Sequence, residues 1–159
     1  MAQSKMYLIL GNGGHARVVK DLIEKKDGGI IHVFNDDIVY DACFEPGLPL
    51  MIAIGNNMVR KKIVAKVKHP MPVLIHPSAQ IAADVVLGEG TIILANAVIQ
   101  AGAKIGKHCL INANVVIDHD VEVGDFVNIY PNVYIGGAAT VGDLISIDPG
   151  TIIARMQKV

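Results

Sequence analysis

The carboxyl-terminal half of the chain carries a branched aliphatic residue at every sixth position. The series begins at Ile75 and continues without interruption to Ile153. Its members are Ile75, Ile81, Leu87, Ile93, Ile99, Ile105, Ile111, Ile117, Val123, Ile129, Ile135, Val141, Ile147 and Ile153. An α-helix would rotate these positions by about 240° per repeat and could not hold them on one face. The spacing therefore excludes a helix over this region.

A second small or β-branched side chain stands two positions before each of these aliphatic residues. Alternation with period two is typical of a short strand, because alternate side chains point to the same side. Glycines directly after the aliphatic position, such as Gly88 and Gly106, are predicted to supply the turns. A fixed unit of strand and turn indicates a parallel β-helix whose coils pack on one another. Since three units close one coil, residues 75–159 predict roughly four to five coils.

Residues 1–70 follow a different pattern, in which short apolar runs alternate with helical spacing. Strands are predicted at 7–10, 30–34 and 50–54, and helices at 15–26 and from Asn56 or Asn57 to about 67. This order is typical of a small Rossmann-like α/β domain with a parallel sheet. Pro70 and Pro72 mark its end. We therefore expect an α/β domain over 1–70 and a β-helix domain over 71–159.

A glycine-rich turn joins the first predicted strand to the first predicted helix. The segment from Gly11 to Ala16 fits G-x-G-x-x-A, and Asp36 follows at the end of the second strand. Amide groups at a helix start can hold a phosphate, and an acidic side chain can bind a ribose hydroxyl. A dinucleotide needs two such halves and a longer domain, so we expect a single nucleotide. The structural alternative is a plain turn, with Asp36 and Asp37 as a solvated strand end.

Three adjacent ionisable residues, Asp118, His119 and Asp120, interrupt the aliphatic repeat. Histidine suits general base catalysis near neutral pH. A neighbouring carboxylate can hold one tautomer of the ring and stabilise the imidazolium that forms. The three residues are therefore a candidate catalytic group. The alternative is a polar turn at a corner of the coil.

Composition excludes several classes of protein. The formal net charge is −1, and the basic residues form no cluster typical of nucleic-acid or membrane-surface binding. Hydrophobic residues make up 52% of the chain, yet no apolar run approaches the roughly 20 residues of a membrane span. We expect a cytoplasmic protein without a signal peptide. Cys43 and Cys109 lack metal-site spacing, so no metal site is predicted.

Five segments of the chain together resemble a known family. They are GNGGHARVV at 11–19, FNDD at 34–37, AIGNNMVRKKI at 53–63, LIHPSA at 74–79 and the hexads that contain DHD. In this order they are similar to the hexapeptide-repeat acetyltransferases that modify nucleotide-linked amino sugars or sialic acid for bacterial surface glycans. The resemblance implies a left-handed β-helix and a homotrimer with active sites between subunits. It also implies acetyl-CoA as co-substrate and a nucleotide-sugar acceptor.

The resemblance implies specific roles for individual residues. The family's catalytic base falls on His119 and its carboxylate partner on Asp120. The implied acetyl-CoA contacts are Gly136, Gly137 and Asn128, with a backbone amide at the glycines polarising the thioester carbonyl. The implied nucleotide contacts are Gly13, Gly14, His15, Asp36, Asp37, Gly55, Asn56 and Asn57.

The hypothesis that follows is direct acetyl transfer from acetyl-CoA to the amine of a UDP-linked amino sugar. O-acetylation of sialic acid is the alternative within the same class. A non-catalytic trimeric module that binds nucleotide sugars is the alternative from another class, because the family has further coils beyond the position where IIARMQKV ends this sequence. A nucleotide-dependent oxidoreductase would leave the hexad array unexplained.

Overall fold

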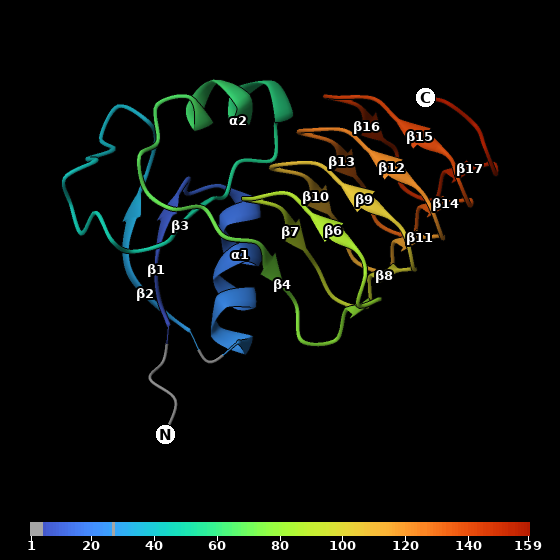
Figure 1. Ribbon diagram of the computed structural model, residues 1–159. Helices are drawn as coiled ribbons and strands as arrows, with labels where there is room; N and C mark the ends of the chain where they lie inside the picture. The colour runs from blue at the N-terminus through green and yellow to red at the C-terminus, as the bar shows by residue number, and fades with distance from the viewer. Residues whose placement is uncertain (1–4, 27) are drawn as a thin grey trace. The chain divides into compact units, whose positions relative to one another are not determined.

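The computed structural model describes residues 5–26 and 28–159 (Figure 1). The chain divides into two compact units, the first ending at Pro72 and the second spanning Val73–Val159. The first is an α/β unit and the second is a β-helix. Within the described ranges, no helix has both the length and the hydropathy that crossing a membrane requires.

The α/β unit is built on a parallel sheet with the strand order β2-β1-β3. Its strands are β1 (Met6–Leu10), β2 (Gly29–Phe34) and β3 (Leu50–Ile52), and its helices are α1 (Gly14–Lys25) and α2 (Asn57–Val64). Strand β3 ends two residues before the predicted limit. The reason is local, because the carbonyl groups of Ile54 and Gly55 accept hydrogen bonds from the Arg60 side chain and leave the sheet.

The β-helix is formed by strands of two residues each, arranged in three parallel sheets. The strands are β4 (Leu74–Ile75), β5 (Gln80–Ile81), β6 (Val86–Leu87), β7 (Ile92–Ile93), β8 (Val98–Ile99), β9 (Lys104–Ile105), β10 (Leu110–Ile111), β11 (Val116–Ile117), β12 (Glu122–Val123), β13 (Asn128–Ile129), β14 (Tyr134–Ile135), β15 (Thr140–Val141), β16 (Ser146–Ile147) and β17 (Ile152–Ile153). Every third strand pairs in register, as Val116 does with Val98 and Tyr134. Three hexads therefore complete one left-handed coil, and the coils follow one another in sequence order (Figure 1).

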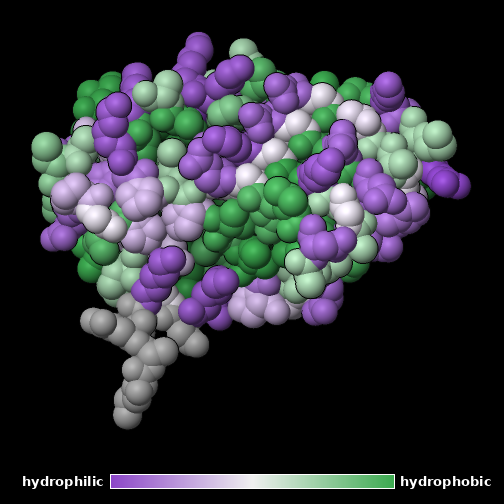
Figure 2. Space-filling view, viewed as in Figure 1, coloured by the Kyte–Doolittle hydropathy of each residue, from purple (hydrophilic) through white to green (hydrophobic). Residues whose placement is uncertain are grey.

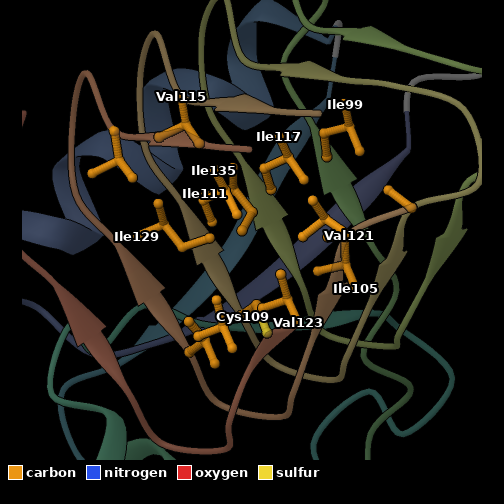
Figure 3. Close-up of a cluster of buried hydrophobic side chains, with 14 of the residues drawn as sticks. Ile99, Ile105, Cys109, Ile111, Val115, Ile117, Val121, Val123, Ile129 and Ile135 are labelled. Carbon is orange, nitrogen blue, oxygen red and sulfur yellow. The ribbon is translucent and has the colours of Figure 1, made fainter. Parts of the chain in front are cut away.

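The predicted aliphatic positions form the interior of the β-helix. Ile117 and Ile135 are completely buried, and Figure 3 shows them in one cluster with Ile99 and Ile111. Branched side chains favour extended backbone and pack well between pleated strands. The six-residue period thus fills the space enclosed by the three sheets. Apolar residues also reach the surface between hydrophilic ones (Figure 2), and Ile152 is 74% exposed.

The turns differ from the sequence prediction. Residues with positive φ lie at the fourth hexad position, as in Asn114 and Asp120, both with φ 58°. The glycines at the second position have another role, since a Cβ atom on Gly106 would lie 2.5 Å from the carbonyl carbon of Gly124. The prediction that these glycines supply the turns was wrong. They allow successive coils to approach closely at one corner.

Asparagine occupies the left-handed turn position in three successive coils. Asn96 donates from Nδ2 to Oδ1 of Asn114 at 3.3 Å, and Asn114 donates in the same way to Asn132 at 3.2 Å. Asparagine tolerates positive φ better than most residues because its short amide can hydrogen-bond locally. The ladder links three turns along one corner of the stack.

Candidate active site

The corner that follows β11 carries Asp118, His119 and Asp120. Because Asp120 adopts a left-handed conformation, its carboxylate lies beside the preceding imidazole, with 2.8 Å between Nδ1 of His119 and Oδ2 of Asp120. An ionised carboxylate only accepts hydrogen bonds, so Nδ1 carries the proton and donates it. The lone pair is then on Nε2, the atom that a general base needs.

The carboxylate of Asp118 fixes the start of this turn. Its Oδ1 accepts a hydrogen bond from the backbone N–H of His119 at 2.7 Å, and its Oδ2 accepts one from the hydroxyl of Tyr134 at 2.8 Å. The amide of His119 and then the hydroxyl of Tyr134 hold the pKa of Asp118 below its ordinary value. The same bond to Asp118 raises the pKa of Tyr134. Asp118 is therefore an ionised anchor for the backbone of His119.

Two glycines from neighbouring coils enclose the pair of His119 and Asp120. A Cβ atom on Gly137 would lie 2.7 Å from Nε2 of His119. On the other side, Gly102 has φ 74°, and a Cβ atom there would overlap Oδ1 of Asp120. Only glycine leaves room for both side chains in their observed positions.

The backbone amides of Gly136 and Gly137 differ in their hydrogen bonding. The N–H of Gly136 donates to the carbonyl of Ile153 at 2.9 Å. The N–H of Gly137 makes no hydrogen bond to any residue that the structure describes. Of the two amides, that of Gly137 is the one available to an incoming carbonyl oxygen.

The third residue implied for acetyl-CoA, Asn128, lies elsewhere on the β-helix. It belongs to β13, which pairs with β10 and β16 in a different sheet from β11. Its side chain is buried, at 3% exposure. Within one chain the structure does not bring Asn128 to the corner of His119.

A pocket of about 480 Å³ lies at the carboxyl ends of the strands in the α/β unit. Six of the eight residues implied for nucleotide binding line it, namely Gly13, Gly14, His15, Asp36, Asp37 and Gly55. Asn56 and Asn57 do not. Asn56 caps α2 by accepting a hydrogen bond from the amide of Val59 at 3.0 Å. Asn35 and Ile54 also line the pocket and were missed, although Asn35 directly follows β2 and Ile54 is the last residue of the predicted third strand.

The amino terminus of α1 opens into this pocket. The cap residue Gly13 provides no side-chain hydrogen bond, and the first turn contains no acidic residue. The free amides and the helix dipole favour an anion there. Across the pocket, Asp36 accepts hydrogen bonds from the amides of Ile38 and Val39, whereas Asp37 pairs with Lys66, which lowers the pKa of Asp37.

His15 lies in the first turn of α1 and is largely buried. Burial, followed by the nearby charge of Arg60, lowers the pKa of His15 to about 4. Its Nε2 atom is buried and has no hydrogen-bond partner among the described residues. His15 is therefore neutral at neutral pH.

The other histidines show no comparable arrangement. His76 accepts hydrogen bonds at Nδ1 from the amide and hydroxyl of Ser78, at 3.1 and 2.8 Å. His69 bridges Tyr40 and the carbonyl of Phe44. Across the described residues, no group of three His, Cys, Asp or Glu side chains has the arrangement of a metal site.

Comparisons with known proteins match both units. Residues 7–49 match the PglD N-terminal domain, and residues 102–137 match the family of the bacterial transferase hexapeptide (six repeats). The two units are therefore similar to the hexapeptide-repeat transferases, for the β-helix, and to PglD-type N-terminal domains, for the α/β unit. The UDP-N-acetylbacillosamine N-acetyltransferase of Bacillus subtilis (strain 168) is 34% identical over 112 residues. The match covers 57% of this chain and spans about half of that relative, 52% of its length.

Solved structures resemble the chain over nearly its whole length. A mutant of perosamine N-acetyltransferase from Caulobacter crescentus, in complex with CoA and GDP-perosamine, is 28% identical with a TM-score of 0.76. The similarity covers 100% of this chain and 89% of that one. The acetyltransferase domain of PglB from Neisseria gonorrhoeae FA1090 is 25% identical with a TM-score of 0.80, covering 97% and 93%.

Proposed function

We propose that this hexapeptide-repeat protein transfers the acetyl group of acetyl-CoA to the amine of a nucleotide-linked amino sugar, with UDP as the nucleotide. The observation that carries the proposal is the corner of His119, where a carboxylate orients the imidazole and the amide of Gly137 lies beside it. The named relatives are N-acetyltransferases, which supports transfer to an amine over transfer to a hydroxyl group.

The reaction needs a base because the neutral amine must lose one proton as it forms the amide bond. Nε2 of His119 accepts the proton as the amine nitrogen bonds to the thioester carbonyl carbon. Asp120, hydrogen-bonded to Nδ1, stabilises the imidazolium that forms. The carbon–sulfur bond then breaks, and the departing thiolate of CoA takes up the proton. No acyl-enzyme intermediate is required, so transfer is direct.

The attack also places negative charge on the carbonyl oxygen. The unpaired N–H of Gly137 is the donor proposed for this oxygen, because Gly136 already donates to Ile153. A preorganised backbone donor at such a position typically contributes about 10²- to 10³-fold in rate. The two functions, proton removal and oxyanion stabilisation, thus come from adjacent coils of one corner.

The acceptor's nucleotide is proposed to occupy the pocket of the α/β unit. The open amides of α1 suit its phosphates, and Asp36 is placed for a ribose hydroxyl. CoA and GDP-perosamine are bound in the Caulobacter structure, which supports both a CoA donor and a nucleotide-sugar acceptor for this chain. These are cytoplasmic metabolites, so we place the reaction in the cytoplasm.

A homotrimer with active sites between subunits completes the proposal. The side chain of His119 is 48% exposed in a single chain, and a base in such contact with water needs a cover to exclude it. Near this corner, Val98, Val116, Tyr134 and Ile152 stack by strand pairing on the outer face of one sheet. An apolar strip of this kind suits a neighbouring subunit.

The direct test measures CoA thiol release from acetyl-CoA with a panel of UDP- and GDP-linked amino sugars. We expect release that depends on the acceptor and falls about a hundredfold or more in His119→Ala. Glu122→Gln, an exposed carboxylate on another sheet, serves as the control and should retain wild-type rates.

Two results would contradict the proposal. Unchanged release in His119→Ala would remove the base from the mechanism. Nucleotide binding without release for any acceptor would instead support the non-catalytic binding module.

A further inference from the structure

Arg60 is a buried cation within the α/β unit. It lies in the middle of α2 and is only 1% exposed. Its Nη1 atom donates to the carbonyl of Ile54 at 2.9 Å and to the carbonyl of Gly55 at 3.1 Å. Ile54 and Gly55 both line the pocket proposed for the nucleotide. The guanidinium therefore fixes the backbone of Ile54 and Gly55, which forms one wall of that pocket, although Arg60 itself does not line the cavity.

Hydrogen bonds to carbonyl groups satisfy the donors of a guanidinium but do not cancel its charge. An arginine keeps its proton under all ordinary conditions. Its charge acts over several ångströms where water is excluded, because the local dielectric constant is low. The charge of Arg60 is, after burial, the second cause of the lowered pKa of His15, which places His15 and the start of α1 within electrostatic reach of the guanidinium.

Two sources of positive potential therefore meet at one end of the pocket. One is the open amino terminus of α1, and the other is Arg60 beneath the loop after β3. The titratable group between them, His15, is neutral at neutral pH and adds no charge. An anion bound there would be stabilised by both sources. The guanidinium of Arg17, whose Nη2 lies 4.0 Å from where a Cβ atom on Gly14 would stand, is a further cation at this helix start.

We propose that Arg60 is a positioning residue that makes the pocket select a nucleoside diphosphate over the uncharged nucleoside. It does so by fixing the Ile54–Gly55 wall and by supplying buried positive charge. The proposal rests on the function proposed above and adds the source of its selectivity. Arg60 does not contact the ligand. It acts through the electrostatic field of its guanidinium and by fixing the loop after β3.

The test compares binding of UDP and GDP with binding of uridine and guanosine by isothermal titration calorimetry. Arg60→Gln keeps hydrogen-bond donors and removes the charge. Lys62→Gln removes an exposed charge from the same helix and is the matched control. We expect Arg60→Gln to weaken diphosphate binding at least about tenfold and nucleoside binding less than about twofold, with no change in the control.

A folded Arg60→Gln that binds the diphosphate like wild type would overturn the proposal. An equal loss for nucleoside and diphosphate would also overturn it, since Arg60 would then shape the loop without selecting charge. If Arg60→Gln does not fold, the same affinities are measured for Arg60→Lys, which retains the charge. This variant should keep the wild-type ratio of diphosphate to nucleoside affinity. Loss of that ratio would contradict the proposal.

A second readout requires no ligand. In Arg60→Gln, the NMR titration midpoint of His15 should move from about 4 toward the ordinary histidine value. An unchanged midpoint would mean that the charge of Arg60 does not reach the pocket. Neither measurement depends on acetyl transfer. A failure of this proposal can therefore be distinguished from a failure of the proposed catalytic activity.

Discussion

The imidazole of His119 lies directly against the backbone of Gly137 in the next coil, where a Cβ atom would come 2.7 Å from Nε2. No other side chain could occupy this position without displacing the ring. The ring is half-exposed and can rotate away, so the conflict affects the position of the base more than the stability of the fold.

Gly137→Ala is therefore expected to reduce kcat strongly at little cost in stability. Displacing a positioned base by about 1 Å can lower the rate roughly a hundredfold. The change is measured by acceptor-dependent CoA release together with the thermal midpoint. Gly142→Ala is the control, because its nearest contact, the carbonyl oxygen of Val159, would be 3.5 Å away. Wild-type activity in Gly137→Ala would show that Nε2 is not the reacting atom.

Tyr134→Phe tests the anchor beneath the base. Without the hydroxyl of Tyr134, the carboxylate of Asp118 loses a hydrogen bond that favours its ionised form. The pKa of Asp118 should therefore rise toward its ordinary value. A histidine base must be unprotonated, so His119 and not Asp118 sets the acid limb of the pH–rate profile. The loss of the Asp118 anchor should instead lower kcat at pH 7 roughly two- to tenfold. Tyr130→Phe, which removes an exposed hydroxyl, should leave kcat unchanged. Wild-type kcat in Tyr134→Phe would exclude a role for the Asp118 anchor in catalysis.

His15 should make stability depend on pH. Its pKa is about 4 in the fold and about 6.5 when unfolded, so the unfolded chain binds more protons between these values. The stabilisation is fully present above pH 6.5 and is lost as the pH falls toward 4. The loss should be of order 2–3 kcal/mol, measured as urea midpoints from pH 4 to 7. The slope should flatten in His15→Gln, and an equal slope in that variant would contradict the assignment to His15.

Gly102→Ala separates backbone strain from contact with Asp120. Gly102 and Gly150 have nearly equal positive φ, 74° and 72°, but only Gly102 lies against a neighbouring side chain. Alanine at positive φ costs about 1–2 kcal/mol, so Gly150→Ala should lose this amount in unfolding measurements. Gly102→Ala should lose more and should also reduce acetyl transfer. Equal stability and activity in the two variants would show that the contact has no consequence.

The period of the sequence predicted the interior of the β-helix because it directly encodes which side chains face inward. Ile117 and Ile135 are buried as the hexad requires. The pairing of His119 with Asp120 was also expected, since the two residues are adjacent. The end of β3 was not, because it depends on where the side chain of Arg60 bonds.

Contacts between coils could not be predicted in the same way. Asp118 meets Tyr134, and Asp120 meets Gly102, only because three hexads close one turn. A comparison of positions eighteen residues apart would have suggested the second contact. The role of the second-position glycines was misassigned because glycine suits both a left-handed turn and a close approach of backbones. Sequence alone does not distinguish these two uses.

The in-register pairing of strands limits how the length of the β-helix can change during evolution. Adding or removing a single hexad would keep the interior apolar, yet it would move every later corner to a different sheet. Ladders such as Asn96 with Asn114, which are separated by 18 residues, would lose their partners. A whole coil is therefore the smallest duplication or deletion that keeps the column of Gly102, Asp120 and their successors aligned. Homologues with longer or shorter stacks should differ by multiples of this unit, and shorter insertions should be confined to corners where a loop can protrude.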